Sequence, residues 1–84
     1  MKFNLSKSTE DLVVAMEELS ELQKEISKAL RDKADINHIT EEIADVEIVI
    51  EKLKKQFNIS NSNIEKWKKF KKQRTKNIYN KGMV

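Results

Sequence analysis

Residues 12–30, LVVAMEELSELQKEISKAL, place apolar side chains at alternating steps of three and four residues. This spacing is typical of one face of an α-helix. The apolar stripe consists of Leu12, Met16, Leu19, Leu22 or Gln23, Ile26 and Leu30. Ser8-Thr9-Glu10-Asp11, just before it, has the form of a capping box, in which a hydroxyl and a carboxylate satisfy the first free N–H groups. We therefore expect a first helix over residues 9–32.

Two further helices are predicted downstream. A polar connection over residues 32–38 leads to a second stripe, formed by Ile39, Ile43, Val46, Ile50, Leu53 and Phe57. This stripe predicts a helix over 40–57 with Thr40 as its N-cap, because the sustained helical spacing outweighs the β-branched run at 48–50. Ser62-Asn63-Ile64-Glu65 is a second capping box and predicts a basic helix over 63–79, which ends at Lys81-Gly82.

The fold class that follows is all-α, with residues 1–84 as a single domain of three helices. A chain of 84 residues without cysteine has only a marginal core of its own. The second helix is apolar over more than one face, since Ile48 and Val49 lie off its stripe, so it needs more than one neighbour. We expect a homodimer or homotetramer built around a four-helix-bundle core, with Trp67 anchoring the third helix into the bundle.

Charge is distributed unevenly along the chain. Residues 1–51 carry six Lys/Arg and thirteen Asp/Glu, whereas residues 52–84 carry eleven Lys/Arg and one acid, Glu65. This asymmetry suits a molecule that binds both a cation and a phosphate, and it equally suits helices that neutralise one another. No stretch has the roughly 20 apolar residues of a membrane span, and residues 1–7 lack an apolar signal core, so we expect a cytoplasmic protein that does not bind membranes.

Two pairs of acids stand beside the apolar stripes. Glu18 and Glu21 are three residues apart, as are Glu42 and Asp45, so each pair lies on one side of its helix. Packing the two stripes together should bring the four carboxylates towards one another, with no basic residue at the same positions to neutralise them. Such a group suits Mg²⁺, which binds a few carboxylates and completes its shell with water and substrate phosphate. The alternative is a solvated acidic surface, because exposed helices are rich in glutamate.

These residues carry a resemblance to a known family. Glu17-Glu18-Leu19-Ser20-Glu21-Leu22 followed by Glu41-Glu42-Ile43-Ala44-Asp45-Val46 resembles the paired E-E-x-x-E and E-x-x-D motifs of the MazG-like all-α nucleoside triphosphate pyrophosphohydrolases. The similarity covers residues 10–80 and is closest to the short members often seen in phages.

The resemblance implies hydrolysis of (deoxy)nucleoside triphosphates between the α- and β-phosphates, giving a monophosphate and pyrophosphate in nucleotide-pool house-cleaning. It implies Mg²⁺, or Mn²⁺ in its place, held by Glu18, Glu21, Glu42 and Asp45, with Glu17 as a further ligand or water-orienting base. Family members work as dimers or dimers of dimers. Their later helix commonly contributes basic residues near the phosphates, and the candidates here are Lys69, Lys72, Arg74 and Lys76.

Two other functions remain open. The basic stretch 66–76, with Trp67 and Phe70 interleaved, is typical of a nucleic-acid-binding module. A non-catalytic interaction module would use the same scaffold without chemistry. His38, the sole histidine, is interpreted as a surface residue.

Overall fold

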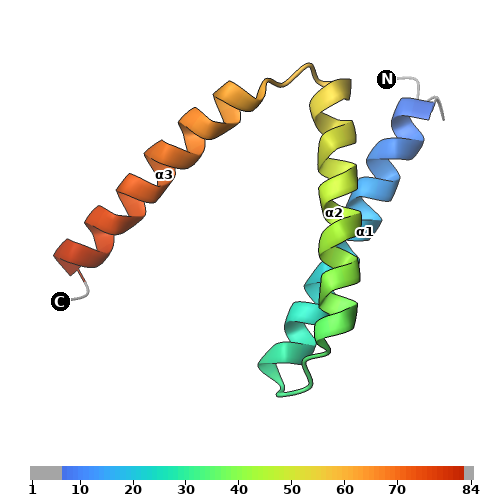
Figure 1. The fold of residues 1–84 in the computed structure, drawn as a ribbon, viewed down its shortest axis with the longest axis horizontal. Helices are drawn as coiled ribbons and strands as arrows, with labels where there is room; N and C mark the ends of the chain where they lie inside the picture. The colour runs from blue at the N-terminus through green and yellow to red at the C-terminus, as the bar shows by residue number, and fades with distance from the viewer. Residues whose placement is uncertain (1–6, 83–84) are drawn as a thin grey trace, which may run out of the picture.

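The computed structural model describes the backbone of residues 7–82 and the side chains of residues 9–75. Over this range the chain forms three helices and no strand: α1 (Lys7–Leu30), α2 (Ile36–Gln56) and α3 (Asn61–Gly82) (Figure 1). The all-α prediction is therefore confirmed. Each helix starts earlier than predicted, α2 by four residues and the other two by two residues, and the differences at α2 and α3 have local causes.

α1 ends in a Schellman motif. Asp32 adopts the left-handed conformation with φ 60°. The N–H groups of Asp32 and Lys33 donate to the carbonyls of Ala29 and Lys28, at 3.1 and 2.9 Å. These two bonds satisfy carbonyls that the helix end leaves unpaired. α1 stops there, two residues before the predicted end.

The predicted N-cap of α2 is wrong. Asp35 is the N-cap, and its Oδ1 accepts a hydrogen bond from the His38 N–H at 3.1 Å. Thr40 lies inside the helix, where its hydroxyl donates to the Ile36 carbonyl at 2.7 Å. Both residue types cap well, but the aspartate comes first along the chain and lets the helix gain a further turn.

A second Schellman motif joins α2 to α3. Asn58 is left-handed with φ 52°. The N–H groups of Asn58 and Ile59 donate to the carbonyls of Lys55 and Lys54. The hydroxyl of Ser60, two residues before the predicted cap Ser62, then accepts from the Asn63 N–H at 3.2 Å and starts α3. The predicted capping box at 62–65 is therefore misplaced.

α1 and α2 form an antiparallel hairpin, and within residues 7–82 they are the only two helices that contact each other (Figure 1). The apolar side chains buried between them are small: Ala15, Val46 and Val49. Val49 had been assigned to a position off the stripe, and this assignment is wrong. Among the described side chains no large one is fully buried, so the hairpin core is thin.

The predicted α1 stripe mostly faces away from α2. Met16 is 71% exposed and Leu30 86% exposed, and Leu19 and Ile26 are also exposed. On α2, the stripe residues Ile43, Ile50 and Phe57 are exposed too. The helices meet along a seam shifted by about one position, which is lined by Leu12, Ala15, Glu18, Leu22 and Glu25 on α1 and by Ile39, Glu42, Val46, Val49 and Leu53 on α2.

α3 projects away from the hairpin (Figure 1). The radius of gyration is 16.8 Å, against about 12 Å for a compact chain of this length. Trp67 is 60% exposed, so within one copy of the chain it does not anchor α3 to α1 or α2. Its expected contact with an oligomeric bundle stays a prediction. None of the helices within residues 7–82 is at once long enough and apolar enough to cross a membrane.

Candidate metal centre

Three carboxylates meet across the α1–α2 seam. One oxygen from each of Glu18, Glu42 and Asp45 lies within 4.8 Å of the others. Glu18 comes from α1, and the other two stand one turn apart on α2. Glu18 and Glu42 are partly buried, whereas Asp45 is exposed. We call these three residues the carboxylate cluster.

The register of the hairpin produces this meeting. Glu25 lies near His38, with 3.9 Å between Oε1 and Nδ1, and a carboxylate oxygen of Glu18 lies within 4.8 Å of one of Asp45. Moving back seven residues along α1 thus moves the contact forward seven residues along α2, as expected for antiparallel helices whose facing side chains repeat about every seven residues. The cluster is therefore a direct result of helix pairing.

The carboxylates of the cluster repel one another. Partial burial raises the pKa of Glu18, and its pKa is raised further by the charge of Asp45, by a hydrogen bond with that side chain and by the charges of Glu42 and Glu21. Burial likewise raises the pKa of Glu42, followed by the charges of Asp45, Glu21, Glu25 and Glu41. Carboxylates so placed are stabilised by protons or by a cation.

Glu42 also has an unsatisfied oxygen. Its Oε2 is buried and has no hydrogen-bond partner, and among the described side chains the same holds only for Oε1 of Glu25. A buried carboxylate oxygen without a donor costs free energy. A ligand that offers positive charge at this point would remove the cost.

The structure does not bring every predicted ligand into the cluster. Glu21 contributes its charge to the pKa of both Glu18 and Glu42, but its carboxylate pairs with Lys24 at 3.1 Å and is exposed. The expectation that no basic residue lies beside the acids is wrong at this position. Glu17 is exposed and lies outside the cluster.

Sequence reasoning missed Glu25. This residue is only 7% exposed, and its Oε2 pairs with Lys28 at 3.0 Å. Its charge acts on the pKa of Glu42, which places it beside the cluster. The signal that could have found it is its distance of seven residues from Glu18, which puts both on the same helix face. His38 was expected at the surface and is exposed.

The predicted phosphate-binding residues lie elsewhere. Lys69, Lys72 and Arg74 are exposed on α3, which does not contact the helices that hold the cluster. The guanidinium of Arg74 lies 6.0 Å from the centre of the Phe70 ring. The side chain of Lys76 is outside the described residues. Among the described side chains, α3 therefore adds no basic group to the cluster within one copy of the chain.

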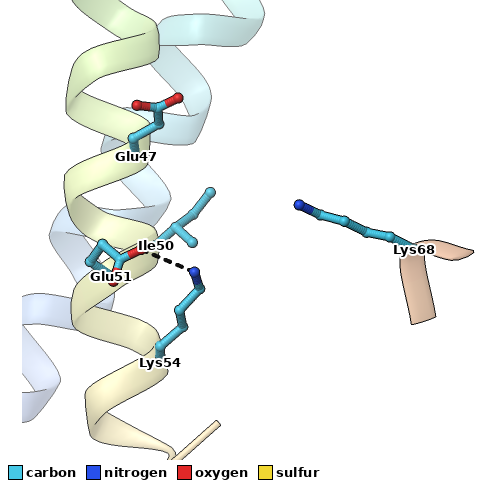
Figure 2. Close-up of a pocket in the computed structure, with 5 residues that line it drawn as sticks. All are labelled: Glu47, Ile50, Glu51, Lys54 and Lys68. Atoms are coloured by element: carbon cyan, nitrogen blue, oxygen red, sulfur yellow. Dashed lines mark hydrogen bonds and ion pairs between the residues drawn. The ribbon is translucent and has the colours of Figure 1, made fainter. Parts of the chain in front are cut away.

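A hollow of about 400 Å³ lies between α2 and α3. Figure 2 shows Lys68 reaching from α3 towards α2, where Lys54 pairs with Glu51 at 3.0 Å. Glu47 and Ile50 complete its lining. No residue of the carboxylate cluster lines it, so this hollow and the candidate metal centre are separate features.

No model of a protein family matches this chain, and neither the curated proteins nor the solved structures include a match to it.

Proposed function

We propose that the chain is a Mg²⁺-dependent nucleoside triphosphate pyrophosphohydrolase of the MazG-like type, which hydrolyses the bond between the α- and β-phosphates. The observation that carries this proposal is the meeting of Glu18, Glu42 and Asp45 within 4.8 Å across the seam. These residues belong to the E-E-x-x-E and E-x-x-D motifs on which the resemblance rests. The motifs thus contribute side chains to one place in space.

The donor set fits Mg²⁺ by its chemistry. It consists of carboxylate oxygens, which Mg²⁺ prefers, and only three residues contribute, which leaves positions for water and phosphate. The unpartnered Oε2 of Glu42 and the raised pKa of Glu18 and Glu42 both favour a cation at this point. When bound, Mg²⁺ would polarise phosphoryl oxygens and lower the pKa of a bound water.

The residues of the chain have separable roles in this proposal. Glu18 and Asp45 would hold one side of the site, where a bound cation would offset the repulsion that raises the pKa of Glu18. Glu42 supplies the buried oxygen. Glu21 stays beside the cluster, where its carboxylate pairs with Lys24.

We further propose that the chain works as a homodimer or a larger homo-oligomer. Large exposed side chains follow the seam positions by one residue: Met16, Leu19 and Ile26 on α1, and Ile43 and Ile50 on α2. In an antiparallel pair, positions one residue after the seam emerge on the same side of both helices. The hairpin thus has one apolar side, which a second hairpin would cover in a four-helix arrangement.

The test is a product analysis with three proteins: the wild type, Glu42→Gln, and Glu47→Gln as a matched control on the same helix outside the cluster. Each is incubated with Mg²⁺ and with each nucleoside triphosphate and deoxynucleoside triphosphate, and the products are separated by ion-exchange chromatography. We expect monophosphate and pyrophosphate from the wild type and the control. Glu42→Gln should lose more than the about 10- to 100-fold that follows loss of an outer-shell partner.

Other products would contradict the proposal. Diphosphate and orthophosphate would show that a different bond is cleaved. Equal turnover by Glu42→Gln and the wild type would remove the cluster from the reaction. Absence of turnover by the wild type with every nucleotide would favour a non-catalytic interaction module.

A further inference from the structure

α3 carries a dense positive charge that its own chain does not neutralise. Six of the nine residues at positions 66–74 are basic: Lys66, Lys68, Lys69, Lys71, Lys72 and Arg74. The nine residues span about 13 Å of helix. The single acid of the helix, Glu65, pairs with Lys68 at 3.3 Å. Because α3 does not contact α1 or α2, the acidic hairpin does not cover this charge.

α3 also exposes two aromatic rings. Trp67 is 60% exposed and Phe70 57% exposed. The rings meet edge to face, with centroids 5.9 Å apart. Together with Lys66 they line a shallow, mainly apolar hollow. Exposed aromatic side chains on a helix that no other helix covers can stack on a flat group of a binding partner.

Three of the six basic residues share one face with the rings. At 100° per residue, Lys71 and Arg74 lie within about 40° of Trp67 around the helix, and Phe70 lies within about 60°. Arg74 already stands over the Phe70 ring, at 6.0 Å from its centre. We call Lys66, Trp67, Phe70, Lys71 and Arg74 the aromatic–basic face. Helices that lie on membranes instead separate an apolar face from a charged one, so this pattern does not fit a lipid surface.

We propose that the aromatic–basic face binds single-stranded nucleic acid, in addition to the nucleotide hydrolysis proposed for the carboxylate cluster. The basic side chains contact successive phosphates, and an unpaired base stacks on Trp67 beside Lys66. Phosphate contacts supply affinity without sequence preference, and stacking on an aromatic ring accepts any base. A duplex keeps its bases stacked on one another and offers no free base to Trp67.

Trp67 is the sole tryptophan, so its fluorescence reports directly on the proposed contact. The probe is an oligothymidylate of about 20 nucleotides, which exceeds the about 4–16 nucleotides that one small binding module covers. The full chain is titrated in EDTA, which keeps divalent cations away from the carboxylate cluster. We expect quenching of Trp67 and an affinity that falls with salt at a log–log slope of about −2 to −3 for three to four phosphate contacts.

Variants separate the two parts of the face. Lys66→Glu with Lys71→Glu should reduce the salt slope by about 1.4, the loss of two phosphate contacts. The control pair Lys33→Glu with Lys52→Glu makes the same change of net charge off α3 and should leave the slope unchanged. Trp67→Leu, measured by the anisotropy of a labelled oligonucleotide, should weaken binding by about 10-fold, as expected for loss of one stacked base.

Circular dichroism checks that α3 stays helical in each variant, and the hairpin should be unaffected because it does not contact α3. Glu42→Gln should bind the oligonucleotide like the wild type, which separates this proposal from the proposed hydrolysis. Absence of quenching, or equal effects of the two lysine pairs, would overturn the proposal. Equal affinity for a duplex, or binding of phosphatidylserine vesicles but not of the oligonucleotide, would also overturn it.

Discussion

At the scale of single residues, the carboxylate cluster places acidic side chains at partly buried positions, where their charge is unfavourable. Glu18 and Glu42 occupy positions on the seam where the neighbouring buried side chains are Ala15, Val46 and Val49. Partial burial there disfavours the ionised form, and the adjacent carboxylates disfavour it further. A purely structural seam would carry apolar residues at these positions, so the acids weaken the hairpin when no cation is bound.

The pH dependence of metal-free stability follows from this placement. The pKa of Glu18 and that of Glu42 are raised in the folded state, so the folded chain binds protons more tightly than the unfolded chain. Stability should therefore rise as the pH falls from about 7 towards the ordinary glutamate pKa of about 4.3, and it should be lost as the pH rises through the folded-state pKa. Urea unfolding in EDTA at about pH 7 and about pH 5 measures the effect.

Glu42→Gln should show a smaller gain on acidification, because one of the two titrating groups is gone. Glu47→Gln should keep the gain of the wild type. A wild-type protein that loses stability as the pH falls from about 7 to about 5 would contradict the assignment of the effect to the cluster. An equal gain of stability in Glu42→Gln and the wild type would contradict it as well.

At the scale of elements, the helices were predictable and their contact was not. The three- and four-residue spacing predicts the first two helices because an α-helix must bury one face, a capping box predicts the third, and no proline interrupts the chain. The same spacing cannot identify the neighbour that each face contacts. Ala15, Val46 and Val49 let α1 and α2 approach closely, which leaves the larger Met16 and Ile43 on the adjacent side. The carboxylate pairs were noticed because they border both faces, whereas Glu25 was hidden in the seam.

The cap of α2 offers a direct test of local structure. Asp35→Ala should destabilise the chain by about 1 kcal/mol, because the His38 N–H loses its acceptor. Thr40→Ala is the control, since its hydroxyl bonds within the helix and the position does not cap it. Urea unfolding of both variants measures the difference. A larger loss for Thr40→Ala than for Asp35→Ala would return the start of α2 to residue 40.

At the scale of the whole molecule, the hairpin and α3 each leave a surface uncovered. The core of the hairpin is thin, which agrees with the expectation from chain length and composition that a single copy is only marginally stable. That reasoning indicated a need for partners but could not show which side they cover. It also predicted that Trp67 anchors the third helix into the bundle, but a sequence does not show which surface supplies that contact.

The proposed oligomer depends on the apolar side of the hairpin. Ile50→Lys should raise the dissociation constant of the oligomer at least about 10-fold, since burying an isoleucine side chain contributes about 1.5–3 kcal/mol. Ile48→Lys is the matched control, because Ile48 is exposed on α2 but off this side. Sedimentation velocity over a range of concentrations measures the change. A wild-type chain that stays monomeric throughout would contradict the oligomer.

We propose that Glu18, Glu42 and Asp45 together hold a divalent cation, and titration with Mn²⁺ followed by electron paramagnetic resonance measures this binding. The signal of free Mn²⁺ should disappear on addition of the wild type or Glu47→Gln, return when excess Mg²⁺ is added, and persist with Glu42→Gln. Equal loss of signal with Glu42→Gln, or no loss with the wild type, would contradict the claim.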